Sequence, residues 1–276
     1  MNKTIYIIGG TTEAGHAAAR LQADGYHAVI SVATALGERT AAASAFALRD
    51  RAAAAFGAGA APGGPDGNSA GGLRLDPGRK TAAEMAAAVK RTGAAAILDC
   101  SHPYAVTATA EARQAAGIAA VPYLRYARPP VEAPAAECFR DAASAARRLA
   151  ETGGRALLTI GVRNLEPFIS AGAGFAVRIL PVVESLEACL ELGIAPPDII
   201  AAQPPFDVDF NRACLRRAAA RFLVTKDSGA EGGLPEKLAA AAAEDVRVLM
   251  LKRPPEPDGA YYDLESVMNR LAAVSG

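Results

Sequence analysis

The sequence predicts an α/β protein of two domains, each a parallel sheet covered by helices on both faces, with a ligand cleft between the domains. First, short apolar runs of strand-forming residues alternate with helical segments in both halves of the 276-residue chain. Such alternation is typical of repeated βα units. Second, each half contains a glycine-rich turn that follows a strand and opens a helix. Third, Pro129, Pro130 and Pro134 interrupt the alternation near the middle of the chain, which indicates a linker.

In the first half, the element boundaries follow from composition. Residues 4–8 are a short run of strand formers, and Gly25 and Gly93 each close a helix, because glycine tolerates the left-handed conformation of a helix end. Residues 57–72 consist almost only of Gly, Ala, Pro and small polar residues, so we expect a surface loop there. The expected strands are 4–8, 27–33, 73–75, 95–100 and 121–126, and the expected helices are 12–23, 81–91 and 107–116.

The second half repeats the alternation, with expected strands at 155–160, 175–180, 198–202, 221–225 and 246–251. We therefore predict a first domain at 1–128, a linker at 129–137 and a second domain at 138–276. In parallel sheets of this kind, ligands bind beyond the carboxyl ends of the strands. Both glycine turns fall there, as do the polar loops 101–104, 161–164 and 203–206. This concentration of polar loops is what predicts the cleft.

Composition and charge exclude several classes of protein. The formal net charge is zero and there is no Trp, so the chain offers neither a basic face nor an aromatic platform for nucleic acid. The four cysteines form no CxxC pair, which predicts reduced thiols and no metal site. No apolar stretch approaches the ~20 residues of a membrane span, and residues 1–30 lack the pattern of a signal peptide. We expect a cytoplasmic protein without a membrane partner, as a monomer or a small homo-oligomer.

The first glycine turn, residues 9–15 with the sequence GGTTEAG, differs from both common nucleotide-binding patterns. It lacks GxGxxG, and although its glycines have the GxxxxG spacing of a phosphate-binding loop, His16 stands where such a loop requires Lys. A nucleotide triphosphatase is therefore disfavoured, whereas a pyrophosphate at the helix start fits. The alternative is that the glycines only form a tight turn. The candidate cofactor ligands are Gly9, Gly10, Thr11, Thr12 and Glu13, the last as a helix cap or a ribose ligand.

The end of the second strand bears on the choice of cofactor. NAD-binding domains place an acidic residue there for the ribose 2′-hydroxyl, but residues 31–39 read SVATALGER and have no acid at the strand end. The hydroxyls of Ser31 and Thr34 and the charge of Arg39 suit a 2′-phosphate better. We therefore favour NADPH over NADH, with an ordinary solvated charge as the alternative interpretation of Arg39.

The other strand ends supply candidates for catalysis and for binding carboxylates. His102 follows a strand and precedes a proline, with Tyr104 beside it, so both are candidate proton donors. Four cations near the predicted cleft suit a substrate with several carboxylates, although any one of them could be an ordinary surface charge. These are Arg125, Arg128, Arg163 and Lys226, with Asn164 and Gln203 as further substrate ligands, and Ser101, His102, Lys226, Ser228 and Gly229 as further cofactor ligands.

Seven segments occur in an order and spacing that is specific as a set. They are GGTTEA at 9–14, SVAT at 31–34, DCSHPYA at 99–105, PYLRYARP at 122–129, LTIGVRNL at 158–165, VRILP at 177–181 and VTKDSG at 224–229, and the pairs Glu236-Lys237 and Arg253-Pro254 close the series. Together they resemble the precorrin-6A reductase family of cobalamin biosynthesis. The resemblance covers nearly the whole chain apart from an alanine-rich insert near 41–72, to which it assigns no role.

The resemblance implies two Rossmann-like domains, with a nicotinamide cofactor and a tetrapyrrole between them. It implies NAD(P)H-dependent reduction of one ring double bond of precorrin-6A, or of its cobalt form, and no metal held by the protein itself. The chain departs from the family after Gln203, where Pro204 replaces a glycine. Because proline has no N–H and a fixed φ, the resemblance supports no main-chain contact at this point.

Two other classes stay open. A two-domain α/β glycosyltransferase would bind a nucleotide sugar, and a small-anion binding protein would close on its ligand, although exported examples need a signal peptide. A short-chain dehydrogenase is disfavoured, since no Tyr-x-x-x-Lys pair occurs. Binding of a reduced nicotinamide distinguishes the reductase from both alternatives.

Overall fold

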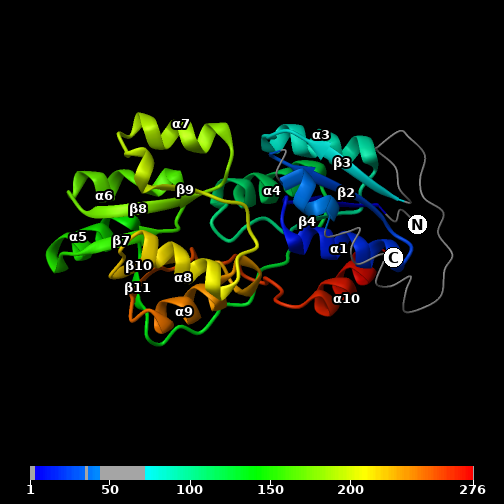
Figure 1. The fold of residues 1–276 in the computed structure, drawn as a ribbon. Helices are drawn as coiled ribbons and strands as arrows, with labels where there is room; N and C mark the ends of the chain where they lie inside the picture. Colours follow the sequence, from blue (N-terminus) through cyan, green and yellow to red (C-terminus); the bar gives the residue numbers. More distant parts are fainter. Residues whose placement is uncertain (1–3, 35–36, 44–71, 276) are drawn as a thin grey trace. The chain divides into compact units, whose positions relative to one another are not determined.

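The computed structural model describes residues 4–34, 37–43 and 72–275. They form two compact units, each with its own parallel sheet (Figure 1). The first unit combines Met1–Arg128 with Pro254–Gly276, and the second is Pro129–Arg253. Apart from Gly72, the surface loop expected at 57–72 lies outside the described residues. Among the helices of the described ranges, none has the length and apolar character needed to cross a membrane.

Five parallel strands form the sheet of the first unit, in the order β3-β2-β1-β4-β5. Each lies where a short apolar run was predicted. The strands are β1 (Thr4–Ile8), β2 (His27–Val32), β3 (Leu73–Pro77), β4 (Ala96–Asp99) and β5 (Tyr123–Arg125). The helices are α1 (Thr12–Ala23), α3 (Ala82–Thr92), α4 (Val106–Ala119) and α10 (Leu264–Ser275), and residues 37–43 are also helical.

Local sequence explains where these helices begin and end. At the start of α3, the Thr81 hydroxyl accepts a hydrogen bond from the Glu84 N–H, and the Glu84 carboxylate accepts one from the Thr81 N–H at 2.8 Å. This reciprocal pair is a capping box. Gly93 closes the same helix at φ +63°, in the left-handed region that glycine adopts without strain. Glycine and threonine at these positions therefore fix the length of α3.

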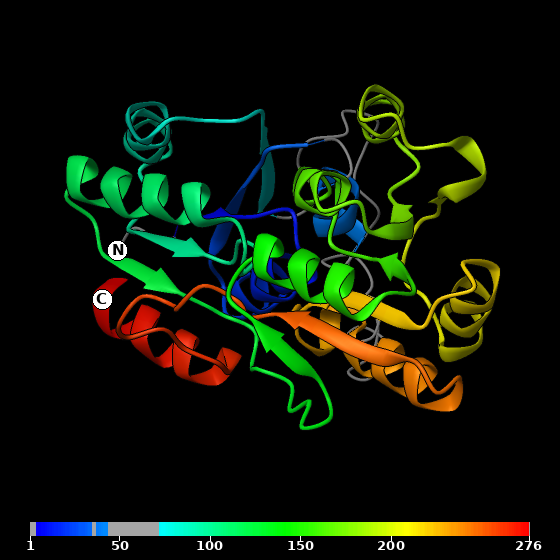
Figure 2. The ribbon, with the colours of Figure 1, turned by 90° about the vertical axis from the view of Figure 1, so that its left-hand side faces the viewer.

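Alternate residues of the strands face opposite sides of the first sheet, as the two-residue period of a strand requires. Ile5 and Ile7 pack with α1 and α10 on one face, whereas Tyr6 and Ile8 pack with α3 and α4 on the other. Figures 1 and 2 show these helices on the two faces of the sheet. The sheet is thus buried on both sides, which explains its nearly continuous apolar strands.

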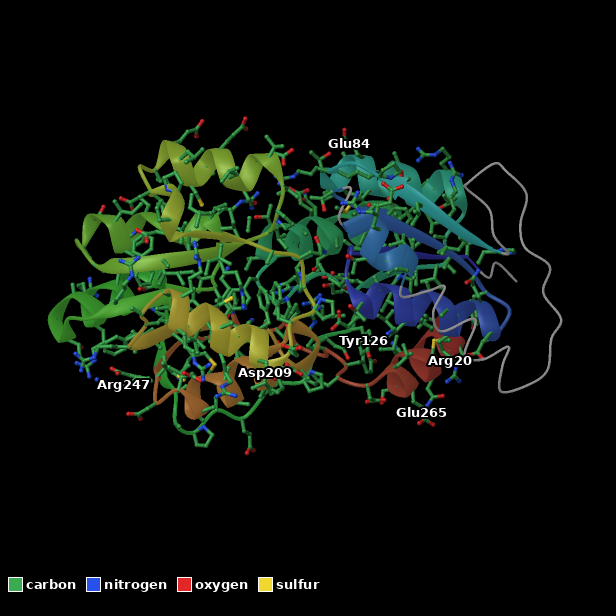
Figure 3. All side chains as sticks on the ribbon, viewed as in Figure 1. Arg20, Glu84, Tyr126, Asp209, Arg247 and Glu265 are labelled. Atoms are coloured by element: carbon green, nitrogen blue, oxygen red, sulfur yellow. The ribbon has the colours of Figure 1, made fainter. Side chains whose placement is uncertain are left out.

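The C-terminal segment corrects the predicted domain division. The sequence interpretation assigned all of 138–276 to the second domain, but Pro254–Gly276 belongs to the first unit. Val267 and Leu271 of α10 are fully buried in the same cluster as α1, while Arg20 and Glu265 lie on the exposed sides of these two helices (Figure 3). The physical reason is that α1 covers only part of this face of the sheet. The apolar side of α10 buries the part of the face that α1 leaves exposed.

The sheet of the second unit has the order β6-β11-β10-β7-β8-β9, and all its strands are parallel. Its strands are β6 (Glu137–Phe139), β7 (Arg155–Leu158), β8 (Gly174–Ile179), β9 (Ile199–Ala201), β10 (Phe222–Lys226) and β11 (Arg247–Leu251). The helices are α5 (Ala142–Thr152), α6 (Glu166–Ser170), α7 (Val183–Glu191), α8 (Val208–Arg217) and α9 (Leu234–Ala243), with short 3₁₀ turns at Val162–Asn164, Pro196–Asp198 and Ala230–Gly232.

Strand β6 was not predicted, because its three residues begin inside the expected linker and are too short to show a period. It forms the edge of the second sheet against β11. The residues assigned to a linker therefore start the second unit, and the chain passes between the units at two places, after Arg128 and after Arg253.

The two sheets share one topology. The order β9-β8-β7-β10-β11 in the second unit repeats the order β3-β2-β1-β4-β5 of the first. In each, the chain builds outward from one central strand and then returns to the other side of that strand. The reversal lies between β1 and β4 in the first unit and between β7 and β10 in the second. Ligands of open α/β sheets bind at the carboxyl ends of the strands that flank such a reversal.

Candidate functional site

At the reversal point of the first unit, the first glycine turn packs against two other backbone segments. Gly9 has φ +128°, and a Cβ added to it would lie 2.9 Å from the carbonyl oxygen of Cys100. A Cβ on Gly10 would lie 2.3 Å from the Cα of Gly37, which begins the helical segment 37–43. The Gly9 N–H also donates to the Ser31 carbonyl at 3.0 Å. Both glycines are therefore needed for close backbone packing that brings the ends of β1, β2 and β4 together.

The start of α1 presents main-chain donors at this point. Thr11 caps the helix, since its hydroxyl accepts from the Ala14 N–H at 3.2 Å and donates to the Cys100 carbonyl at 2.8 Å. Within the described ranges, the amides of Gly10, Thr12 and Glu13 donate to no protein acceptor. Unsatisfied amides at the positive end of a helix dipole suit an anionic group such as a phosphate. The Thr11 hydroxyl itself serves the protein rather than a ligand.

Glu13 and Arg128 were assigned to different ligands, but the structure pairs them with each other. The Arg128 Nη2 donates to the Glu13 Oε2 at 2.8 Å, and the Arg128 Nε also forms an ion pair with the Glu13 Oε1. Both side chains are buried. Their separation of 115 residues gave no sequence signal for this pair. The two charges therefore compensate each other inside the first unit.

Arg125, expected from the sequence to bind a substrate carboxylate, pairs with two acids inside the first unit. Its guanidinium is 2% exposed and forms ion pairs with Glu256 at 2.8 Å and with Asp99 at 3.2 Å. Burial lowers the pKa of Arg125, but the hydrogen bond that it donates to Glu256 and the charge of Asp99 outweigh this effect, so the pKa is raised overall. The Arg125 Nη1 also donates to the Ser101 carbonyl at 2.8 Å. Arg125 thus holds the loop that carries His102.

Asp99 completes this network. It accepts from the Ser101 N–H at 2.9 Å and from the Tyr123 hydroxyl at 2.8 Å. Burial and the nearby Asp99 carboxylate raise the pKa of Tyr123, so this hydroxyl stays protonated as a donor. Sequence reasoning missed the roles of Asp99 and Glu256, because Glu256 reaches the site from the C-terminal segment that was assigned to the other domain.

The two predicted proton donors lie together in this loop. The Tyr104 N–H donates to the His102 Nδ1 at 3.2 Å, and the two rings are 5.7 Å apart. Because Nδ1 accepts a hydrogen bond, the neutral His102 ring carries its proton on Nε2. Both side chains are half-buried, whereas Ser101 is buried with its hydroxyl 3.1 Å from that of Thr109. Of the loop residues, His102 and Tyr104 are therefore the ones with side chains suited to meeting a ligand.

The end of β2 lies beside the first turn. The Thr34 hydroxyl accepts from the Gly37 N–H at 3.0 Å and so caps the segment 37–43. Arg39 is exposed on this segment, whose first residue touches Gly10. Ser31 is buried and contributes its carbonyl to the turn. The structure therefore places the first residue of the segment that carries Arg39 against the first turn, while Ser31 and Thr34 shape that turn through their carbonyl and hydroxyl groups.

The reversal point of the second unit carries a positive cluster. Lys226 ends β10, and its pKa is lowered first by burial and then by the nearby charge of Arg163. Arg163 is exposed in the 3₁₀ turn after β7, and the Asn164 Nδ2 donates to the Ile160 carbonyl at 2.9 Å, which holds this turn. The charge of Arg163 disfavours the charged form of Lys226, and an anion bound near both cations would offset this effect.

The second glycine turn is fixed by its own hydrogen bonds. The Ser228 hydroxyl donates to the Gly232 carbonyl at 3.2 Å, and Gly229 has φ +73°. Asp227 forms a two-point ion pair with Arg253 at 2.7 and 2.9 Å. Ser228 and Gly229 therefore shape the turn that follows Lys226. In the described part of the chain, no group of three or more His, Cys, Asp or Glu side chains is arranged to hold a metal.

Gln203 lies apart from the Lys226 cluster, at the end of edge strand β9, where Pro204 and Pro205 are joined by a cis peptide bond. It is exposed. Since β7 and β8 separate β9 from β10, Gln203 does not extend the positive cluster directly.

The family profile and the relatives found by sequence comparison point to one family. The sequence profile of the family "Precorrin-6x reductase CbiJ/CobK" matches residues 60–272. The chain is 34% identical over 191 residues to a cobalt-precorrin-6A reductase of Methanothermobacter thermautotrophicus, a match that spans 64% of this chain and 62% of that protein. It is 32% identical over 213 residues to a cobalt-precorrin-6A reductase of Priestia megaterium, spanning 72% of this chain and 81% of the relative.

Two further relatives extend the comparison. A precorrin-6A reductase of Mycobacterium tuberculosis is 34% identical over 168 residues, which cover 59% of this chain and 65% of that protein. The solved structure of CobK precorrin-6A reductase matches with a TM-score of 0.71 at 24% identity and covers 99% of this chain and 98% of that chain. The structural match shows that the fold is shared.

Proposed function

The chain belongs to the precorrin-6x reductase family CbiJ/CobK, and from this premise we propose that it reduces one ring double bond of precorrin-6A, or of its cobalt form, with NAD(P)H. The product is the corresponding 6B compound of cobalamin biosynthesis. The observation that carries the proposal is the start of α1, where unsatisfied amides meet the His102 loop at the reversal point between β1 and β4.

The donors at this point fit the diphosphate of a nicotinamide cofactor. The amides of Gly10, Thr12 and Glu13 supply N–H groups at the positive end of α1, and Gly9 and Gly10 place no side chain at this point. No acid stands at the end of β2, whereas Arg39 is exposed on the segment 37–43, whose first residue touches Gly10. These features favour a cofactor with a 2′-phosphate, NADPH, over NADH. When bound, the reduced nicotinamide supplies the hydride.

His102 and Tyr104 are the candidate proton donors to the reduced tetrapyrrole. The hydrogen bond at Nδ1 leaves the Nε2–H of His102 as its donor, and the tyrosine hydroxyl lies in the same half-buried loop. In the second unit, Lys226, Arg163 and Asn164 form the proposed site for substrate carboxylates, with Gln203 as a separate contact. That the two sites face one cleft stays a prediction from the sequence.

Binding of reduced cofactor tests the proposal directly. Energy transfer from protein tyrosines to the nicotinamide should report NADPH binding, and turnover of precorrin-6A should oxidise it. Arg39→Gln should weaken NADPH binding by roughly tenfold with little effect on NADH, since one charge-assisted contact contributes about 1.5 kcal/mol. Arg20→Gln, a change of an exposed arginine on α1, is the matched control. Failure to bind either nicotinamide, together with binding of a nucleotide sugar, would favour the glycosyltransferase alternative.

His102→Ala separates the two candidate donors. If His102 donates the proton, kcat should fall by 10²-fold or more while the Kd of NADPH stays unchanged. If kcat is retained at all pH values, Tyr104→Phe becomes the variant to examine, and retention in both variants assigns the proton to water.

A further inference from the structure

One buried arginine of the second unit lacks the partner that the other buried arginines have. Arg125, Arg128 and Arg178 are the arginines buried in the described ranges. The first two pair with acids. Arg178 is 6% exposed, and no Asp or Glu of the described residues pairs with it. Burial of a charge costs several kcal/mol unless a counter-charge compensates it, so this exception calls for a physical explanation.

The surroundings of Arg178 fix the position of its guanidinium. It lies near the carboxyl end of β8, with its Cζ 4.2 Å from the centre of the Phe206 ring. Phe206 in turn stacks on Phe210 of α8 at 4.8 Å, with the ring planes 8° apart. A guanidinium over an aromatic face gains cation–π attraction, which helps to hold the Arg178 side chain in this position.

Hydrogen bonds hold one end of the group. The Arg178 Nη1 donates to the Asn211 Oδ1 at 2.8 Å. The Asn211 Nδ2 donates to the Asp207 carbonyl at 2.7 Å, which orients the amide so that its oxygen faces the arginine. Cys214 adds a longer contact, with its Sγ 3.9 Å from the same nitrogen. None of these partners is an Asp or Glu carboxylate.

The opposite edge of the guanidinium carries N–H donors that bond to no acceptor among the described residues. Within the described residues, the Nε and Nη2 atoms of Arg178 have no hydrogen-bond acceptor. This edge presents two parallel N–H groups, which is the geometry that binds both oxygens of a carboxylate. Consistently, burial lowers the pKa of Arg178, because no acid offsets the cost of its charge. A single uncompensated positive charge matches a single carboxylate better than a doubly charged phosphate.

We propose that Arg178 is a subsite for one carboxylate of the substrate, held ready by Phe206 and Asn211. The inference rests on the proposed function, because it takes the ligand to be a tetrapyrrole with carboxylate side chains. It adds a contact at β8 to the positive cluster at the end of β10 within the same sheet. Sequence reasoning noted the segment 177–181 only as a family resemblance, since burial without an acid partner is visible only in the fold.

The test uses the full chain and uroporphyrin, a porphyrin with a carboxylate on every peripheral side chain, and follows binding by porphyrin fluorescence. Arg178→Gln should weaken uroporphyrin binding about 30-fold or more, the effect of truncating one partner of a buried charge pair, and should leave the Kd of NADPH unchanged. The matched control is Arg247→Gln, which removes an exposed arginine that stacks on Phe222 and pairs with Glu137 at the amino end of its strand. Its affinity for uroporphyrin should equal that of the wild type.

A second variant protects the test against misfolding of Arg178→Gln. Asn211→Asp places a carboxylate beside the guanidinium, so it should neutralise the charge and weaken uroporphyrin binding at least threefold in a folded protein. Unchanged uroporphyrin affinity in either folded variant overturns the inference. A parallel loss of NADPH affinity also overturns it, because the anion would then be a cofactor phosphate. If the wild type itself binds no uroporphyrin and turns over no precorrin-6A, the proposed function fails and the subsite fails with it.

Discussion

Replacing Gly10 by alanine examines the packing on which the candidate cofactor site depends. The Cβ of such an alanine would lie 2.3 Å from the Gly37 Cα, 2.7 Å from its carbonyl carbon and 2.9 Å from its oxygen. All three are backbone atoms, so no side chain can rotate away. Non-bonded carbon atoms pack at about 3.5–4.0 Å. The first turn and the segment 37–43 must therefore move apart by about 1 Å or more.

The expected loss of stability follows from this overlap. Overpacking of a well-packed region costs about 1–3 kcal/mol. For a domain of this size, that corresponds to a fall in Tm of roughly 2–12 °C. The displacement also shifts the amides of Thr12 and Glu13, since Gly10 leads directly into α1. We therefore expect NADPH binding to fall more steeply than global stability alone would require.

Gly117→Ala is the matched control, because it adds the same methyl group to the same unit with the opposite expected effect. Gly117 lies within α4, is exposed, and has no atom within 4 Å of an added Cβ. Alanine in a helix is favoured over glycine by about 0.5–1 kcal/mol. Thermal unfolding by circular dichroism and NADPH titration of both variants provide the comparison.

A Gly10→Ala variant that melts with or above the wild type and binds NADPH equally well would contradict this packing. That outcome would mean that Gly10 and Gly37 do not approach closely in solution. A drop in Tm with full NADPH affinity would instead confirm the packing and remove the α1 amides from the cofactor site.

Three further predictions concern the remaining polar groups. Glu256→Gln removes a charged partner of Arg125 and should lower the free energy of unfolding by about 2 kcal/mol. Amide hydrogen exchange in the loop 101–104 should become faster, and an unchanged rate there would contradict the role of Glu256 in positioning this loop. Hydrogen bonds led by that from Arg216 lower the pKa of Glu244 to about 2. Because this value lies below the unfolded one of about 4.3, the contribution of Glu244 is complete above about pH 4.5 and lost as the pH falls toward 2. Glu244→Gln should therefore flatten the acid limb of a plot of Tm against pH, and an unaltered limb would argue against the ion pair. Finally, Cys138 is exposed whereas the other three thiols are buried, so Ellman's reagent should modify one thiol rapidly in the native protein and all four after denaturation.

Much of the fold was predictable, because its signals are local. The strand at Thr4–Ile8 and the helix at Thr12–Ala23 have the bounds that the sequence predicted, since an apolar run, a glycine turn and a capping threonine all act within a few residues. Strand β6 escaped prediction because three residues at an edge show no period. The place of α10 also escaped, since an amphipathic helix specifies that it needs an apolar surface but not which sheet provides it.

The site was predictable only in outline. Parallel topology places polar loops at the carboxyl ends of strands, and the structure does group the first turn with the His102 loop there. The roles of individual charges were not predictable, because partners such as Glu13 and Arg128 are 115 residues apart. An arginine in a loop looks the same in sequence whether it faces a ligand or a buried acid.

By itself, the sequence determined the α/β class, the alternation of strands and helices and the family resemblance, because these depend on short-range periodicity and on motif order. Only the tertiary structure decided which cations are already neutralised, that Arg178 is buried without an acid, and that the C-terminal helix completes the first unit. The reason is that burial and charge pairing are set by long-range contacts, and the free energy of an ionised group depends on those contacts more than on its neighbours along the chain.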